Sequence, residues 1–194
     1  MIRMRTILAV AALMALLLTT GCVDADRFII RYDIDRNLRG TVTLEFLGIH
    51  SPGEKPEEQQ QEMKEFYDGG YREEAAGMEK DWSLSEAHTE ITNKTPLRCD
   101  AKLTGEIEDL VKSLAPLVRE GGTAYEIKRH AHRFSFTARG GWSENDKNLS
   151  LIITYAGKIV EQNAQKYDEA AHRMEWNLGE LTDSGIHFVL EVED

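Results

Sequence analysis

The sequence predicts an α+β domain in which a curved antiparallel sheet packs against two or three helices, and three observations support this fold class. In several short runs, apolar residues alternate with polar ones and β-favouring residues are common, which is typical of strands with one buried face. In two other segments the apolar residues recur every three or four positions, as in amphipathic helices. The strands come in groups joined by short connections, which favours antiparallel pairing over alternating βαβ units.

The first 21 residues have the composition of a secretory signal peptide. Arg3 and Arg5 form a basic start, and residues 7–18 are almost wholly apolar. About a dozen apolar residues are too few to span a bilayer, which needs roughly twenty. We therefore expect this leader to be cleaved and leave it out of the fold prediction.

The leader ends in Leu18-Thr19-Thr20-Gly21-Cys22, which resembles the lipobox of bacterial lipoproteins. The resemblance implies cleavage before Cys22, a diacylglycerol on its sulfur and acyl chains such as palmitate. Two or more chains hold a domain stably at a membrane, at about 0.8 kcal/mol per buried methylene. The domain would then lie outside the cytoplasm, on the cell membrane or the outer membrane. The alternatives are an uncleaved anchor or a plain signal peptide with a coincidental Gly-Cys.

The rest of the chain is acidic and has one thiol. Residues 22–194 hold 21 basic and 34 acidic residues, a net charge of −13, which argues against a nucleic-acid partner. We expect residues 22–26 to form a lipidated tether and residues 27–194 to form one domain. Cys99 lies in an alternating run, which predicts a buried strand position rather than a reactive thiol.

A β-hairpin is predicted first, from the alternation in residues 28–34 and 42–46 around a turn at residues 36–40. Residues 54–82 are then predicted to form an acidic helical segment, broken by Gly69-Gly70 into two helices or one kinked helix. Its apolar stripe is either a lid over an apolar ligand, a membrane-facing helix or ordinary packing, and the acidic opposite face favours ordinary packing. The stripe comprises Met63, Phe66, Tyr67, Tyr71, Ala75, Met78 and Trp82.

A strand around Cys99 and a second helix, over residues 104–118, follow the acidic segment. The helix prediction depends on Ile107, Leu110, Val111, Leu114 and Leu117, with Pro116 ending or kinking its last turn. Beyond residue 123 the pattern predicts only strands. The alternation changes phase within residues 128–133, which requires a turn or bulge, and further strands are predicted at 149–155, continuing through 158–160, at 173–177 and at 186–192.

The segment in which the alternation changes phase, residues 128–133, contains a basic cluster in an otherwise acidic chain. Lys128, Arg129 and Arg133 surround His130 and His132, and these cations would repel a metal ion, so we expect no metal site. The cluster either contacts a phosphate or sulfate headgroup on the membrane-facing side or is a solvated turn. The sequence has no nucleophile elbow, zinc-protease motif or phosphate loop. We therefore predict a non-enzymatic protein without a cofactor.

The last third resembles a known domain family. Tyr155-Ala156-Gly157-Lys158-Ile159-Val160-Glu161-Gln162-Asn163 and the later Met174-Glu175-Trp176-Asn177-Leu178 are similar to the paired pattern of the LppM-like lipoprotein domain. In that family an aromatic-x-Gly-Lys-Val segment precedes a turn and a Thr-x-Trp strand. The chain departs from the family at Ala156, where Pro is favoured, and by an insertion at residues 165–172. The resemblance implies a membrane-anchored α+β domain and, for mycobacterial members, association with envelope glycolipids.

These observations predict an envelope lipoprotein that binds a lipid or glycolipid in an apolar cleft. We expect Phe28, Ile30, Phe134, Phe136 and Trp176 to line the cleft, although the same pattern suits a plain core. The alternative is an envelope assembly protein that contacts a protein partner through its acidic helical segment.

Overall fold

The computed structural model describes residues 23–119, 124–140, 148–181 and 185–193, and it confirms the α+β class. The predicted leader and Cys22 lie outside the described residues. The described strands form two sheets, of orders β3-β4-β2-β1-β7-β10-β9 and β5-β6-β11-β8. The larger sheet contains β1 (Arg27–Ile34), β2 (Gly40–His50), β3 (Ser85–Thr92), β4 (Arg98–Ile107), β7 (Leu149–Tyr155), β9 (Lys166–Asp168) and β10 (Arg173–Asn177). The smaller sheet contains β5 (Ala124–His130), β6 (Arg133–Arg139), β8 (Ile159–Gln162) and β11 (Ile186–Glu191). The helical elements are α2 (Pro56–Glu65), the π-turn η1 (Phe66–Gly70), α3 (Tyr71–Asp81), α4 (Leu110–Leu114), α5 (Pro116–Arg119) and the 3-10 turn η3 (Leu178–Glu180).

The predicted hairpin is β1 and β2, which pair antiparallel along the whole of β1, from Arg27 opposite Leu47 to Ile34 opposite Gly40. Their turn is closed by Asp35, whose carboxylate accepts the backbone N–H groups of Asn37 and Arg39 at 2.8 and 3.0 Å. Leu38 takes a left-handed conformation with φ of 64° inside this turn. The even-numbered residues of β1 are buried, so the sequence alternation assigned the inner face of this strand correctly.

The larger sheet also contains a parallel pair that the sequence did not reveal. β7 runs parallel to β1 and antiparallel to β10. Six of its seven residues are buried, as expected of a central strand covered on both faces. The apolar run of β7 predicts burial but carries no information on strand direction, because either direction buries the same side chains.

The predicted helix over residues 104–118 is wrong in its first half. β4 continues through Ile107, because alternate residues of this stretch reach the core while its backbone pairs with β2 on one side and β3 on the other. The helix starts only at Leu110, where the Asp109 carboxylate caps it by accepting the backbone N–H of Val111 at 2.9 Å. Pro116 separates α4 from α5, as its position predicted.

Three strand assignments in the sequence were incomplete. β3 and β9 were not predicted, and β8 does not continue β7 but joins the smaller sheet beside β11. β3 is an edge strand whose inward residues are only half-buried, so its alternation is weak. The remaining late strands, β7, β10 and β11, lie at or within one residue of the predicted bounds.

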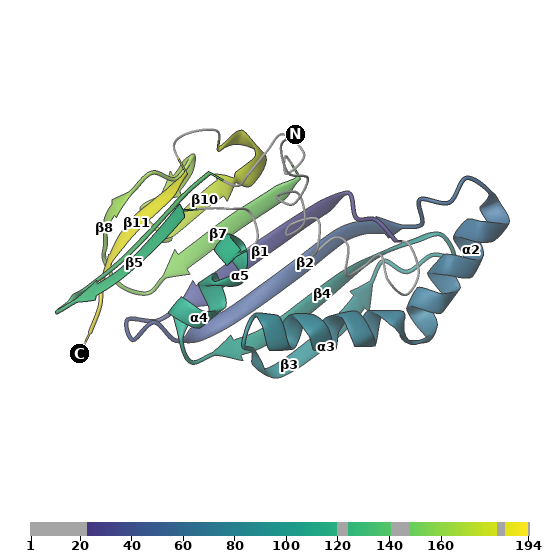
Figure 1. The fold of residues 1–194 in the computed structure, drawn as a ribbon, viewed down its shortest axis with the longest axis horizontal. Helices are drawn as coiled ribbons and strands as arrows, with labels where there is room; N and C mark the ends of the chain where they lie inside the picture. The colour runs from purple at the N-terminus through teal and green to yellow at the C-terminus, as the bar shows by residue number, and fades with distance from the viewer. Residues whose placement is uncertain (1–22, 120–123, 141–147, 182–184, 194) are drawn as a thin grey trace, which may run out of the picture.

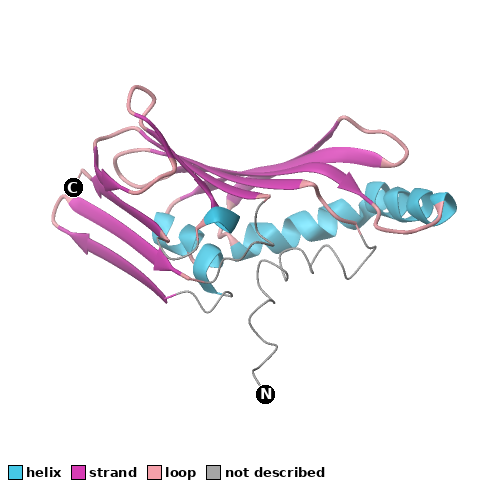
Figure 2. Cartoon of the chain, turned by 90° about the horizontal axis from the view of Figure 1, so that it is seen from above, coloured by secondary structure: helices cyan, strands magenta, loops and turns pink. Residues whose placement is uncertain are grey.

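The acidic segment forms the kinked helix, defined here as α2, η1 and α3. The break lies where the two glycines predicted it, since Gly69 has φ of 166° and ψ of −22° inside the π-turn. The larger sheet arches over this helix, which lies along its concave side (Figure 2). No helix in the described ranges combines the length and apolarity needed to cross a bilayer.

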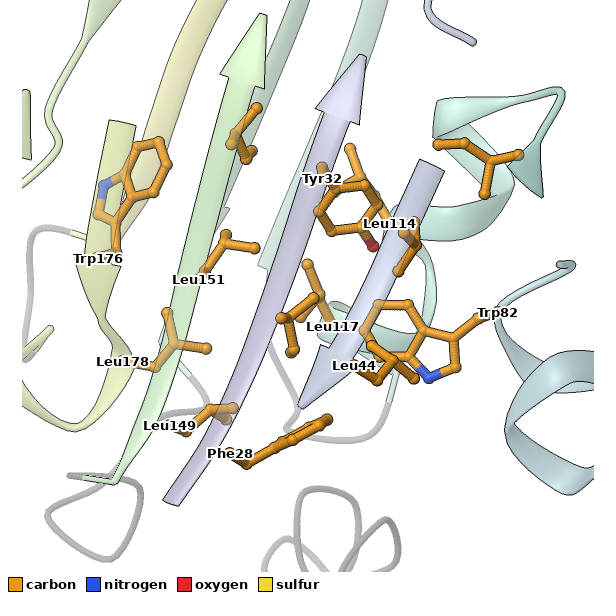
Figure 3. Packing of buried hydrophobic residues seen from close by; sticks show 14 of the residues in the cluster. Phe28, Tyr32, Leu44, Trp82, Leu114, Leu117, Leu149, Leu151, Trp176 and Leu178 are labelled. Atoms are coloured by element: carbon orange, nitrogen blue, oxygen red, sulfur yellow. The ribbon is translucent and has the colours of Figure 1, made fainter. Parts of the chain in front are cut away.

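One continuous core joins the helices and both sheets. Figure 3 shows the part of it that lies on the larger sheet, with Leu114 and Leu117 of the helices. α4 is held over β1 by the buried Tyr32 hydroxyl, which donates to the carbonyl of Ser113 at 2.8 Å. The smaller sheet meets the larger one where the rings of Phe188 and Trp176 lie 6.0 Å apart. The concave face is therefore covered by helices over one part and by the smaller sheet over the other.

Candidate functional site

The candidate site is the seam, the contact surface between the kinked helix and the concave face of β2, β3 and β4. It is lined by Phe46, Ile49, Phe66, Tyr71, Glu74, Ala75, Met78, Thr89, Ala101, Lys102 and Leu103. The seam encloses a cavity of only about 30 Å³, whereas ligand pockets typically measure roughly 300–1,000 Å³. The helix therefore fills the concave face in this conformation, and a lipid chain would enter only if the helix moved.

The helix side of the seam comes from the apolar stripe that the sequence predicted. Phe66 and Met78 are buried, while Tyr71 and Ala75 lie between them and are half-buried. The ring of Phe66 contacts that of Tyr71 at 6.2 Å between centroids. Glu74 lies on the same face and is the one charged side chain classed as buried within the described ranges. The sequence prediction of a lid-like stripe thus identified the residues that face the sheet.

The sheet side of the seam was missed, and a β-bulge explains why. The pairing of β2 with β4 shifts between Phe46 and Ile49, and Gly48 takes φ of 68° there. The extra residue turns Ile49 to the same face as Phe46, which strict alternation does not predict. The Gly48 N–H donates to the Asp100 carboxylate at 2.7 Å, and this bond, with one from the Asn93 amide, lowers the pKa of Asp100.

A tyrosine ties the kink of the helix to the neighbouring loop. The Tyr67 hydroxyl donates to the carbonyl of Thr95 at 2.7 Å and also lies 3.1 Å from that of Arg98. The ammonium of Lys94, in the same loop, lies 3.9 Å from the centre of the Tyr67 ring. Burial raises the pKa of Tyr67, so the hydroxyl keeps its proton and remains a donor. Any outward movement of η1 must break this tie.

The residues after Cys22 join the fold at once, which corrects the predicted tether. Val23 is 2% exposed, and Asp24 forms an antiparallel bridge with His50, with backbone bonds of 2.7 and 2.9 Å. Consecutive Cα atoms are about 3.8 Å apart, so a group attached to Cys22 starts one residue from the packed domain. Residues 23 and 24 are therefore part of the domain rather than a free linker.

The five predicted cleft residues are buried but do not meet at one cavity. Phe28 stacks on Phe46 at 4.4 Å between ring centroids. Phe136 and Trp176 instead contact Phe188 between the two sheets, at 5.3 and 6.0 Å. None of the five lines the seam cavity, and their exposure does not exceed 6%. The full set is Phe28, Ile30, Phe134, Phe136 and Trp176, and in this conformation all five are core residues.

The predicted basic cluster is exposed and lies far from residue 23. Lys128 and Arg129 are on β5 and Arg133 is on β6, with Lys128 paired to Glu126 at 2.8 Å. The turn between these strands bonds to Val192, and the next residue bonds to the β1–β2 turn, so all lie at the distal end of β1 (Figure 1). The eight residues of β1 between these two ends span about 26 Å at roughly 3.3 Å each. The cluster therefore lies at the opposite end of β1 from residue 23, not beside it.

Cys99 and the histidines His130 and His132 are the remaining residues that the sequence singled out. Cys99 is 1% exposed on β4, which confirms the inward strand position, and burial raises the pKa of its thiol. His130 lies on β5 and His132 in the turn. Within the described ranges there is no group of three or more His, Cys, Asp and Glu side chains suited to a metal ion.

Comparison with known proteins supports the fold. No protein-family model matches the chain, and no curated protein matches it by sequence. The NMR structure of the folded domain of the Mycobacterium tuberculosis LppM protein is similar to it, with a TM-score of 0.50. The match covers 91% of this chain and 94% of that domain at 9% sequence identity. At this identity the likeness establishes an LppM-like fold and nothing further.

Proposed function

We propose that the chain is a membrane-anchored lipoprotein of the bacterial envelope and that its domain binds the acyl chain of a lipid or glycolipid in the seam, without catalysis. The observation that carries the proposal is the apolar seam beneath a helix that is already broken at Gly69. The lipobox motif and the LppM-like fold support the anchor and the envelope location. The proposed ligand class follows from the apolar lining, with Glu74 and Lys102 as the charged exceptions.

Binding requires the kinked helix to exchange its contacts with the sheet for contacts with the ligand. Exposing Phe66 and Met78 costs about 3–6 kcal/mol, at about 1.5–3 kcal/mol for each large apolar side chain. Burial of an acyl chain is favourable by about 0.8 kcal/mol for each methylene, so burial of about four to eight methylenes offsets the free-energy cost of opening the seam. The chain of a common membrane lipid is long enough for this exchange. The closed seam is then the ligand-free state.

The methionines of the mature chain provide a direct test. Met63 and Met78 are buried residues of the kinked helix itself, whereas Met174 lies on β10 in the other half of the core. We would label their methyl groups in the chain from Val23 to Asp194 and add a palmitoyl lysophospholipid below its micelle concentration. Binding in the seam shifts the Met78 and Met63 signals and leaves Met174 unchanged.

Two other outcomes of this labelling experiment would contradict binding in the seam. A shift confined to Met174 would place the ligand between the sheets, near the five residues first predicted. Three unchanged signals, together with no lipid found by mass spectrometry of the purified protein, would contradict lipid binding.

An assembly role is the alternative, and the outer face of the kinked helix favours it. Glu57, Glu58, Glu73 and Glu79 are exposed on that face. A photo-crosslinker at Glu58 or Glu79 would then capture one stoichiometric envelope protein in cells, while the same crosslinker at Tyr167, on β9, would not. Capture of no defined partner from either helix position would contradict this alternative.

A further inference from the structure

We infer that the end of the larger sheet where the chain enters the domain, with the β3–β4 loop and the adjoining face of α2 and η1, is the surface that docks on an anionic bilayer. This inference rests on the proposed acylation of Cys22. The surface, called here the docking end, contains Lys64, Lys94, Pro96 and Leu97. It is distinct from the seam and from the basic cluster of β5 and β6.

Strand pairing places the docking end next to the anchor. Asp24 bridges His50 at the end of β2, and His50 is paired with Arg98 at the start of β4. Neighbouring strands lie about 4.8 Å apart, so Arg98 is about 10 Å from Asp24 across the sheet. Leu97 precedes Arg98 and is 40% exposed, one of the large apolar side chains that the fold leaves open to solvent. An acyl group on Cys22 would bring this leucine to the membrane surface.

A groove beside the loop carries the charge suited to lipid phosphates. It has a volume of about 680 Å³ and is lined by Lys64, Lys94 and Pro96, with Asp68 as its one carboxylate. Among the ion pairs of the described residues, neither lysine is joined to a carboxylate. Each lysine near an anionic membrane contributes about 1 kcal/mol of attraction.

Two carboxylates beside the docking end, Asp26 and Asp100, are engaged within the domain. Arg98 forms an ion pair with Asp26, and Asp100 accepts bonds from Gly48 and Asn93. These bonds satisfy the two carboxylates, so neither pairs with Lys64 or Lys94, and the Lys94 ammonium lies against the Tyr67 ring at the groove. The basic cluster lies at the opposite end of β1, whose eight residues span about 26 Å, so it does not contact the same bilayer when the docking end rests on it.

The docking end also adjoins the seam. Phe66 lines the seam and the next residue, Tyr67, lines the groove, so the π-turn separates the two spaces. A lipid leaving the bilayer at the groove would therefore meet the kink first. The hydroxyl of Tyr67 joins this kink to the β3–β4 loop of the docking end.

Single labels on the acylated protein test the orientation. We would compare Leu97→Cys with Tyr125→Cys, a residue of β5 that is 50% exposed. Each variant carries an environment-sensitive fluorophore and is placed in vesicles of phosphatidylglycerol and phosphatidylcholine with brominated chains. Cys99 is buried and Cys22 is blocked by its lipid, so only the introduced thiol reacts. We expect blue-shifted, bromine-quenched emission at position 97 and neither effect at position 125.

The groove lysines are tested with a charge-matched control. Lys64→Gln with Lys94→Gln lowers the ratio of docked to undocked protein by about thirtyfold, at about 1 kcal/mol per lysine. Lys128→Gln with Lys158→Gln removes the same charge from the distal end and leaves quenching at position 97 unchanged. Equal effects of the two pairs would contradict a specific role for the groove.

The result separates this inference from the proposed anchor. If mass spectrometry shows acylated Cys22 and the protein floats with vesicles, but the label at 97 stays in water or the label at 125 is quenched, the orientation is wrong and the anchor stands. If Cys22 carries no lipid and the protein does not float, the anchor and the docking end both fall.

Discussion

Replacing Tyr67 with Phe removes one hydroxyl and is expected to loosen the kink of the helix without unfolding the domain. The hydroxyl joins η1 to the carbonyls of Thr95 and Arg98, and the ring stays in place in the variant. The Arg98 carbonyl keeps two other donors, the N–H and hydroxyl of Thr95 at 2.8 and 2.9 Å. The loss is therefore about one net hydrogen bond, about 1 kcal/mol.

Hydrogen exchange measures this effect locally. A loss of about 1 kcal/mol raises the population of the opened kink about fivefold, so amides of residues 66–71 should exchange about five times faster. Tyr71→Phe is the matched control, because the Tyr71 hydroxyl accepts only from its own neighbour, Arg72, at 3.0 Å. Unchanged exchange in Tyr67→Phe, or the same acceleration in both variants, would refute the idea that Tyr67 ties the helix to the loop.

Three further predictions follow from burial. Met78→Ala, at a seam position 4% exposed, should lower the free energy of unfolding by about 2–5 kcal/mol in urea titration. Burial raises the pKa of Tyr32 above its ordinary value and that of Tyr155 to about 12, so the folded chain holds these protons more tightly than the unfolded chain. Stability should be intact below pH of about 10 and fall as the pH rises toward 12, as urea midpoints and tyrosinate absorbance will show. Cys99 should resist thiol reagents in the folded protein and react once urea unfolds it, and rapid native labelling would contradict its burial.

Local sequence patterns predicted much of the fold for identifiable reasons. The alternation in β1 and β10 places their inner residues correctly because each strand has enough large apolar side chains to show a period of two. Gly69 breaks the helix as expected, because it adopts a non-helical conformation there. Ile107 misled the prediction, because it fits both the helical stripe and the alternation of β4.

The candidate site was visible in the sequence only on its helical side. Phe66, Tyr71 and Met78 recur at helical spacing, so they share one face whatever they pack against. Phe46 and Ile49 share a face only because of the bulge at Gly48, which depends on pairing with β4 and on the bond to Asp100. Sequence periodicity does not encode such a register shift.

The sequence by itself determined which side chains turn inward along β1 and β10 and that Cys22 follows a lipobox-like leader. Only the tertiary structure decided which strands lie together, that the helix closes the seam, and that the basic cluster lies at the opposite end of β1 from Val23. The physical reason is that periodicity reflects which side of an element meets water, a local property. Which strands are neighbours, and which segments lie at the same end of a sheet, depends on contacts between segments far apart in the chain. Examples are the contacts of Asp24 with His50 and of β1 with β7.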